Sequence, residues 1–492
     1  MSRQSPSTAK ALNRSWLLLL CVAALSLIWA DIHIYQVDPW AELWRMLGGL
    51  IIPHWSDAQT LWQAISYTLS FALLAIAISA PLGLLLAMLF HMRLVRISCA
   101  AVRSVHELFW GLIFMQIWGL SATTGLLAIA VPFTGVFAKV FAETFAQQSN
   151  DPADTFGAQV NGLKRYAYAW IPQSWPALSS YIRYRFECAL RSSAILGFIG
   201  LPTLGFHLET MFKQGHYAEA GAILWIFFVL IATIKYWLRP KLIPAYLIAA
   251  MLLLPQTIGF SNGGYFWQFI SHDIWPSALR EGNWLAAWHW YTELFRDQIW
   301  KGVVQTIALT QIALMLTFVL VLILYPFASQ RLSGFWPSRI GQLLLLIFRS
   351  TPEMMLAFIF LLLFGPSGLP AILALALHNG SLIAFLTARA SDAEPAHLHQ
   401  RPDDPKGLLY YAYIETPRRF PALLTFLFYR WELILRESAI MGILGITTLG
   451  FYIDSAFEEF RFDRALVLII VTAVLNVGVD GVSRWLLRRN IA

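Results

Sequence analysis

The stretch Ser193-Ala-Ile-Leu-Gly-Phe-Ile-Gly-Leu-Pro-Thr-Leu-Gly-Phe206 recurs as Ser438-Ala-Ile-Met-Gly-Ile-Leu-Gly-Ile-Thr-Thr-Leu-Gly-Phe451. Nine of the fourteen positions are identical, at an offset of 245 residues. Further matches follow the same order upstream. They pair Trp62 with Trp300 and Thr68 with Thr306 (offset 238), Arg103 with Arg349 and Glu107 with Glu353 (offset 246), and Gly135 with Gly380, Gly162 with Gly407, Pro172 with Pro417 and Arg185 with Arg430 (offset 245). Ordered matches of this kind indicate that the chain is an internal duplication.

The composition is typical of a protein whose solvent is mostly lipid. Of the 492 residues, 58% are apolar and 13% are charged. Soluble domains contain roughly 45–50% apolar and about 25% charged residues. This difference excludes a soluble enzyme of ordinary composition, a disordered protein and a coiled coil. The formal charge of +7 is therefore expected to report membrane topology rather than a nucleic-acid partner.

Membrane crossing by a helix takes ~20 mostly apolar residues, and twelve segments meet this requirement. They are 16–32, 62–90, 98–119, 123–145, 176–200, 218–238, 242–260, 302–326, 340–364, 367–389, 420–446 and 464–487. The windows at 176–200 and 420–446 are the weakest, because each contains Arg and Glu. We therefore predict an all-α polytopic membrane protein with about 12 transmembrane helices.

The loops that connect these segments differ in charge. Sixteen Lys and Arg residues fall on one side of the alternation and seven on the other. The basic side is expected to be cytoplasmic, which places both termini inside the cell. Six spans per copy is an even number, so both copies enter the membrane in the same sense, as a parallel repeat. The predicted units are residues 1–240 and 241–492.

The sequence contains no common nucleotide-binding or metalloprotease motif. G-x-x-x-x-G-K-[ST], H-E-x-x-H and C-x-x-C are all missing. G-x-S-x-G occurs once, as Gly259-Phe-Ser-Asn-Gly263, where the predicted segment 242–260 ends, and the strand that this motif requires before its serine is not predicted there. The three cysteines lie far apart, and the eleven histidines have no metal-ligand spacing. We expect no catalytic residue, no cofactor and no metal site, and the pattern does not favour a membrane enzyme.

Ionisable residues within apolar segments are costly in lipid and tend to face a protein interior. A first group is Arg103 with Glu107 and, in the second copy, Arg349 with Glu353. The i, i+4 spacing predicts that each pair shares one helical face. Such pairs serve either as interfacial salt bridges or as a lining of the inner mouth of a pathway.

A second group lies in and just before the repeated stretch. It consists of Arg185, Glu187, Arg191 and Ser193, and of Arg430, Glu432, Arg436 and Ser438. Regularly spaced glycines follow in both copies, from Gly197 and from Gly442. Glycines at this spacing permit close helix approach or a break in the helix. The pattern is equally compatible with helix packing and with a substrate pathway or gate.

A polar segment precedes a proline in each copy, from about Asp151 to Pro172 and from about Ala393 to Pro417. Each segment mixes charge, Gly and Pro and is too short to fold as a domain. Because the feature is duplicated, we favour a short cytoplasmic helix that fits a groove in another protein over a plain solvated loop.

These motifs resemble a known family. The residues that carry the resemblance are Tyr181-x-Arg183-x-Arg185-Phe186-Glu187 and Arg191-Ser192-Ser193, with Tyr429-Arg430-Trp431-Glu432, Arg436-Glu437-Ser438 and Arg349-Ser350-x-Pro352-Glu353 in the second copy. They are similar to the permease subunits of binding-protein-dependent ABC importers, and closest to the phosphonate-type permeases. The family's usual subunit is one six-span unit that acts as a homodimer, whereas this chain resembles two fused units.

The resemblance implies a type I importer permease in the bacterial inner membrane, which is not itself an ATPase. It implies two cytoplasmic ATPase subunits, which grip coupling helices at Gly162 to Pro172 and Gly407 to Pro417, and a periplasmic substrate-binding protein. The cargo would be a phosphonate or a related small phosphorus oxyanion. Arginine suits such an anion because its guanidinium group can bind two oxygens at once. Other cargo, such as ferric iron or a cationic vitamin, remains an alternative, because Pro202-Thr203 and Thr447-Thr448 stand where the phosphonate branch favours Gly. An ion-coupled secondary transporter is the alternative from another class.

Overall fold

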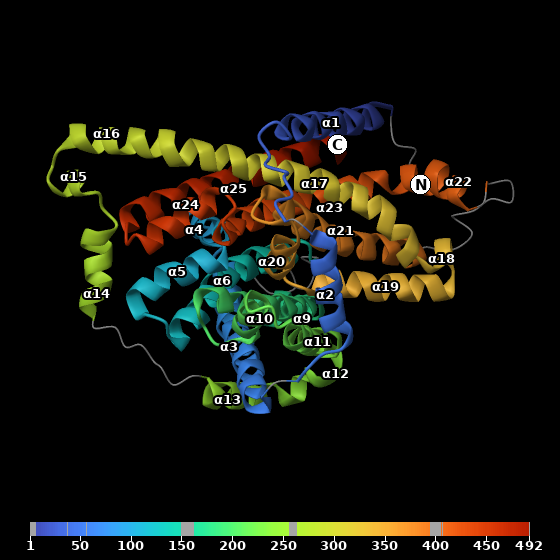
Figure 1. Cartoon of the computed structure of the whole chain (residues 1–492), viewed down its shortest axis with the longest axis horizontal. Coiled ribbons are helices and arrows are strands. Elements are labelled where there is room, and N and C mark those ends of the chain that lie inside the picture. Colours follow the sequence, from blue (N-terminus) through green and yellow to red (C-terminus); the bar gives the residue numbers. More distant parts are fainter. Residues whose placement is uncertain are drawn as a thin grey trace. The chain divides into compact units, whose positions relative to one another are not determined.

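The computed structural model describes residues 6–36, 38–55, 57–148, 162–254, 263–393, 405 and 407–491 (Figure 1). Within these ranges all regular secondary structure is helical. The chain forms two compact units. Unit 1 is Met1–Arg45 with Ile274–Ala492, and unit 2 is Met46–Asp273.

Unit 2 is built around three long helices, α3 (Ala58–Met88), α6 (Ala122–Ala146) and α9 (Ile171–Ile195). The side chain of Asp57 caps α3 by accepting hydrogen bonds from the backbone N–H groups of Gln59 and Thr60. The hydroxyl and the N–H of Thr60 and the N–H of Gln59 lower the pKa of the Asp57 carboxyl. The other helices of this unit are α4 (Arg93–Ser104), α5 (Glu107–Trp118), α8 (Gly162–Arg165), η1 (Tyr166–Trp170), η2 (Leu196–Ile199), α10 (Leu204–Lys213), α11 (Tyr217–Ala232), α12 (Ile234–Trp237), η3 (Pro240–Leu242), α13 (Ile243–Leu253), α14 (Gly263–Gln268) and η4 (Phe269–Asp273).

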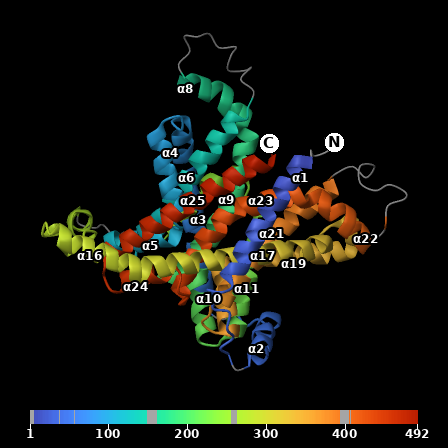
Figure 2. The ribbon, with the colours of Figure 1, turned by 90° about the horizontal axis from the view of Figure 1, so that it is seen from above.

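Unit 1 has a similar succession of helices. Its long helices are α17 (Trp300–Ala328), α21 (Gly368–Ala393), α23 (Thr416–Ile440) and α25 (Phe462–Ile491), and α17 packs along α21 (Figure 2). Between and before them lie α1 (Pro6–Ser26), α15 (Ser277–Arg280), α16 (Trp284–Leu294), η5 (Phe295–Ile299), α18 (Gln330–Ser333), α19 (Phe335–Ser350), α20 (Glu353–Phe364), α22 (Leu408–Tyr410), η7 (Tyr411–Glu415), η8 (Met441–Leu444) and α24 (Leu449–Glu458). Helix α2 (Pro39–Ile51) contains the division between the units.

The first helix of each predicted half packs with the compact unit that contains most of the other half. Helix α1 packs on α17 and α25 of unit 1, and the rings of Trp16 and Phe318 lie 4.2 Å apart. Helix α13 packs on α3 of unit 2. The compact units therefore differ from the chain halves 1–240 and 241–492 by an exchange of their leading helices.

Several helices are suited to membrane crossing. In the described part of the chain, α3, α6, α21, α25 and the continuous helix Trp284–Ala328 are long and apolar enough to cross. Four bent pairs pass the same test: α4 with α5, α9 and η2 with α10, α19 with α20, and α23 and η8 with α24. The apolar helices Trp16–Ser26, Tyr217–Ala232 and Pro240–Leu253 are shorter. The molecule is thus a polytopic helical protein, as predicted.

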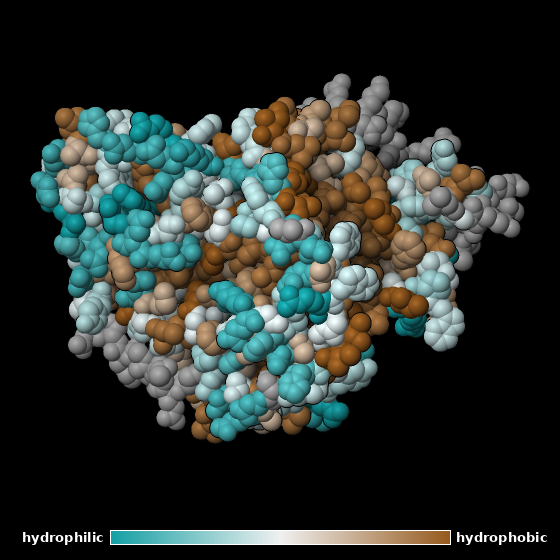
Figure 3. Space-filling model, viewed as in Figure 1, coloured by the Kyte–Doolittle hydropathy of each residue, from teal (hydrophilic) through white to brown (hydrophobic). Residues whose placement is uncertain are grey.

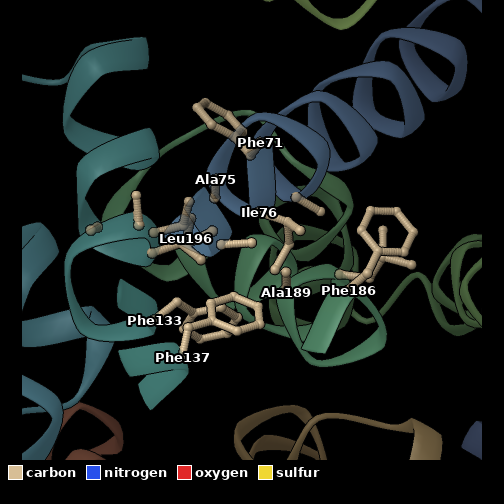
Figure 4. Packing of buried hydrophobic residues seen from close by; sticks show 14 of the residues in the cluster. Phe71, Ala75, Ile76, Phe133, Phe137, Phe186, Ala189 and Leu196 are labelled. Atoms are coloured by element: carbon tan, nitrogen blue, oxygen red, sulfur yellow. The ribbon is translucent and has the colours of Figure 1, made fainter. Parts of the chain in front are cut away.

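The interior is apolar, and so is part of the exterior. Phe71 of α3, Phe133 and Phe137 of α6 and Phe186 of α9 belong to the core of unit 2 (Figure 4). Large apolar side chains also remain exposed, including Ile340 on α19, and brown apolar patches lie among teal and white residues on the face in Figure 3. Apolar exposure of this extent is costly in water and is expected of a surface that meets lipid.

Candidate functional site

The repeated glycine-rich stretch forms the same bend in both units. In unit 2 the helix that ends with η2 meets α10 at 51°, and in unit 1 the helix that ends with η8 meets α24 at 45°. Gly200 and Gly445 end the first arm of each bend with φ of 96° and 84°, a conformation that favours glycine. The sequence allowed either close approach or a helix break here, and both are present.

Close backbone contact holds the second arm of each bend. A Cβ atom on Gly197 would overlap the backbone of Phe206, and one on Gly442 would overlap the backbone of Phe451. A Cβ atom on Gly205 would likewise overlap the carbonyl group of Ala194. These glycines therefore let one arm of the bend pack directly against the backbone of the other.

A buried threonine from a long helix caps the second arm in each unit. The hydroxyl of Thr68 accepts a hydrogen bond from the N–H of Leu204 at 3.0 Å, and the hydroxyl of Thr306 does so from the N–H of Leu449 at 3.0 Å. Both N–H groups belong to the first turn of a helix, where no intrahelical partner exists. In the sequence these threonines only align the two copies, and their structural role was not predicted.

Replacing Thr306 with valine is expected to destabilise the protein by about 1–3 kcal/mol, because the buried N–H of Leu449 loses its acceptor. Thr317→Val is the matched control. Thr317 lies on the same helix, is equally buried, and donates only to the carbonyl group of Ala313 on its own helix. Thermal unfolding of the purified protein in detergent measures both effects. Equal melting temperatures for the two variants would contradict the capping role.

The predicted Arg–Glu pairs do not share a helical face, so this prediction is wrong. Helices α4 and α5 meet at 93° between Arg103 and Glu107, and α19 and α20 meet at 93° between Arg349 and Glu353. The backbone is extended at Val105 and at Thr351. In the second case Pro352 follows, and proline restricts the preceding residue to extended conformations.

Glu107 is buried at the start of α5 and faces the repeated stretch. Its Oε1 atom accepts a hydrogen bond from the hydroxyl of Ser192 at 2.6 Å, and its Oε2 atom lies 3.6 Å from Nε2 of His106. The structure thus brings Glu107 next to the Arg191–Ser193 segment of α9, two features that are 85 residues apart in the chain.

Glu353 holds the corresponding place in unit 1, with different neighbours. Its Oε2 atom lies 3.8 Å from Nε2 of His378. One residue further along α21, the side-chain amide of Asn379 donates to Glu437 at 3.1 Å. All four side chains are buried. His378 and Asn379 were not predicted as site residues, although Asn379 directly precedes Gly380, one of the paired glycines.

Two of the selected arginines lie over aromatic rings. The guanidinium of Arg185 is 4.0 Å from the ring centroid of Phe133, and that of Arg349 is 4.1 Å from the ring centroid of Phe385. Such cation–π contacts stabilise a cation within a protein interior. Four more arginines and two glutamates are partly buried on α4, α9 and α23: Arg103, Arg191, Arg430, Arg436, Glu187 and Glu432.

The selected serines form hydrogen bonds within their own helices. The hydroxyl of Ser193 donates to the carbonyl group of Leu190 at 2.8 Å. The hydroxyl of Ser438 donates to the carbonyl group of Leu435 at 2.8 Å and also lies 2.7 Å from the hydroxyl of Thr310. Both serines are fully buried, and these contacts hold their hydroxyl groups among the packed helices.

The segments before Pro172 and Pro417 are helical from Gly162 and from Leu408 onward. Helix α8 begins at Gly162 and continues through the π-helical turn η1 into α9, and α22 continues through η7 into α23. Pro172 and Pro417 are the second residues of α9 and α23 and directly follow the π-helical turns. The earlier parts of the predicted coupling segments, 151–161 and 394–404, lie outside the described residues.

Comparison with known proteins relates nearly the whole chain to import permeases. It is 24% identical over 490 residues to the phosphate-import permease protein PhnE of Mycolicibacterium smegmatis, covering 92% of this chain and 90% of that protein. It is 28% identical over 172 residues to the phosphite transport system permease protein PtxC of Stutzerimonas stutzeri, covering 35% of this chain and 60% of the relative.

A short Escherichia coli relative, the putative cryptic phosphonate transport system permease protein PhnE2, is 27% identical over 114 residues, covering 23% of this chain and 92% of its own length. No family model and no solved structure matches the chain. These similarities relate the chain to the permease proteins of phosphate, phosphite and phosphonate import systems.

Proposed function

We propose that this protein is the membrane permease of an ATP-driven importer for a small phosphorus oxyanion, a phosphonate or a related anion. The observation that carries the proposal is similarity over 92% of the chain to a phosphate-import permease, together with similarity of shorter stretches to phosphite and phosphonate permeases. The polytopic helical fold supports it.

The chain is proposed to contain two fused permease units of six spans each, in parallel orientation. The PtxC and PhnE2 relatives align over 60% and 92% of their own lengths while covering only 35% and 23% of this chain, so each is much shorter than this chain. The matching bends, glycine contacts and threonine caps of units 1 and 2 support the duplication.

The residues proposed to line the pathway lie at the α4–α5 and α19–α20 bends and near the glycine-rich bend of each unit. Glu107 and Glu353 begin α5 and α20, which pack on η2 and η8 of the repeated stretch. Glu107 accepts a hydrogen bond from Ser192 of α9, and beside Glu353 the amide of Asn379 donates to Glu437 of α23. Arginine suits a phosphorus oxyanion because its fork binds two oxygens at once. The proposed lining residues are Arg103, Glu107, Arg185, Glu187, Arg191, Ser193, Arg349, Glu353, Arg430, Glu432, Arg436 and Ser438.

The proposed partners are two cytoplasmic ATPase subunits and a periplasmic binding protein. Each ATPase would hold one coupling segment, ending at Pro172 or Pro417. The loop charges support an inner-membrane topology with both termini in the cytoplasm. ATP hydrolysis would take place in the partner subunits, since the chain has no nucleotide-binding motif.

The cargo is tested on the binding protein that serves this permease. Isothermal titration with phosphate, phosphite, an alkylphosphonate, ferric ion and a cationic vitamin is expected to show binding of a phosphorus anion only. Competition by the same anion should lower uptake in cells that contain the complete system. Binding of ferric ion or the vitamin, without binding of any phosphorus anion, would overturn the proposed cargo.

A further inference from the structure

A buried ionic cluster fixes the second coupling segment to the helices of unit 1. The Oε1 atom of Glu415, at the end of η7, accepts three hydrogen bonds. The donors are the hydroxyl of Tyr325 at 3.0 Å, the hydroxyl of Ser391 at 2.8 Å and Nε of Arg419 at 3.0 Å. Glu415 is fully buried and Arg419 is 8% exposed. The cluster therefore joins the ends of α17 and α21 to the start of α23.

A buried ion pair with several hydrogen bonds resists separation, because removing one partner leaves an uncompensated charge in the interior. A neighbouring contact reinforces the attachment. Asp392, at the end of α21, accepts hydrogen bonds from the hydroxyl of Ser329 at 2.6 Å and from the N–H of Gln330 at 3.0 Å. Displacement of η7 must accordingly carry α17 and α21 with it.

The corresponding place in unit 2 contains a cavity that is open to the surface. With the offsets of 238 and 245 residues, the counterparts of Tyr325, Ser391, Glu415 and Arg419 are Ala87, Ala146, Trp170 and Ser174. Three of these, Ala87, Ala146 and Trp170, line this cavity of about 380 Å³ together with His91 and with aromatic neighbours that include Phe145 and Tyr166. The buried hydroxyl of Ser174 makes no hydrogen bond within the described residues.

Aromatic contacts are present at this place in the first coupling segment. The rings of Phe145 and Tyr166 lie 5.5 Å apart, and those of Tyr166 and Trp170 lie 4.5 Å apart. Such contacts are individually weaker and less directional than a buried ion pair with three hydrogen bonds. A cavity beside η1 also leaves space into which its side chains can move.

We propose that Glu415 and Arg419 are positioning residues that make the two coupling segments mechanically unequal. When its ATPase moves, the second segment moves together with α17 and α21 of unit 1. In the first segment, side chains of η1 can shift into the cavity, so that part of the ATPase movement is not transmitted to unit 2. This inference rests on the proposed function, because it assigns a mechanical role to the proposed coupling segments. It predicts that coupling between ATP hydrolysis and uptake depends mainly on the second half of the chain.

The test uses the complete importer in proteoliposomes and measures the number of cargo molecules taken up per ATP hydrolysed. Glu415→Gln keeps the shape of the side chain and removes its charge. It is expected to lower this ratio by about tenfold, with the ATPase subunits still bound and hydrolysis continuing. Tyr325→Phe removes one hydrogen bond to the cluster and is expected to give a smaller fall. Ser174→Ala, at the counterpart of Arg419, should leave the ratio unchanged.

Three outcomes would overturn the inference. One is an unchanged ratio in Glu415→Gln. Another is a fall of similar size in Ser174→Ala. The third is a parallel loss of hydrolysis and uptake with a lowered melting temperature in both Glu415→Gln and Tyr325→Phe, which would show that the cluster only stabilises the fold. Failure of the unaltered protein to import with ATP would instead contradict the proposed function, so the two failures are distinguishable.

Discussion

Gly442→Ala is expected to lower the free energy of unfolding by about 3 kcal/mol, the upper part of the usual cost of overpacking. The added Cβ would overlap the backbone nitrogen of Phe451 and the backbone carbon of Gly450. These are main-chain atoms at the start of α24, so no rotamer change can relieve the overlap, and the bend must open. A bend that opens also separates Leu449 from its cap on Thr306.

Gly478→Ala is the matched control for this substitution. Gly478 lies within α25, and a Cβ atom there meets no atom within 4 Å. Alanine at a helical position with free space is neutral or stabilising. Membrane yield and thermal unfolding in detergent distinguish the two variants. Similar melting temperatures for Gly442→Ala and the unaltered protein would show that the two arms of the bend are not in close contact.

Replacing both Tyr168 and Tyr413 with alanine is expected to abolish uptake by preventing ATPase docking. The two tyrosines are counterparts at an offset of 245 residues, and they lie on the π-helical turns η1 and η7 with exposed fractions of 73% and 75%. Exposed aromatic side chains on a coupling segment are typical anchors of a protein interface. Loss of such an anchor costs about 2 kcal/mol or more of binding free energy, and this variant lacks two.

Co-purification of the ATPase subunits with the permease, followed by an uptake assay, measures this effect. The matched control is Tyr429→Ala, because Tyr429 is also exposed but lies sixteen residues further along the same continuous helix, about 24 Å from Tyr413. The control should retain its ATPase. Normal co-purification and uptake in the Tyr168→Ala, Tyr413→Ala double variant would remove these turns from the docking surface.

The sequence alone predicted the elements that depend on apolar length and on repetition. The helical class, the long membrane segments such as 302–326, and the altered helix at the repeated glycines follow from hydropathy and glycine spacing. Pairing of copies also located Thr68 and Thr306 at equivalent places. These features could be predicted because each depends on local composition or on comparison of the chain with itself.

Other features depend on tertiary contacts that spacing does not determine. The i, i+4 rule placed Arg103 and Glu107 on one face only if the helix continued, and the extended backbone at Val105 turns the chain by 93° instead. The contact of Glu107 with Ser192 joins residues on different helices. Likewise, the packing of α1 on α17 could not be predicted, because apolar helices of similar length offer many equivalent partners.

ATP-driven import is the central claim, and reconstitution tests it most directly. The purified protein would be placed in liposomes with its ATPase subunits and binding protein, and uptake of a radiolabelled phosphorus anion would be measured with and without enclosed ATP, and with and without an imposed proton or sodium gradient. We predict uptake that requires ATP and the binding protein and that does not respond to either gradient. Uptake without ATP that dissipates an imposed gradient would contradict this account and identify an ion-coupled carrier.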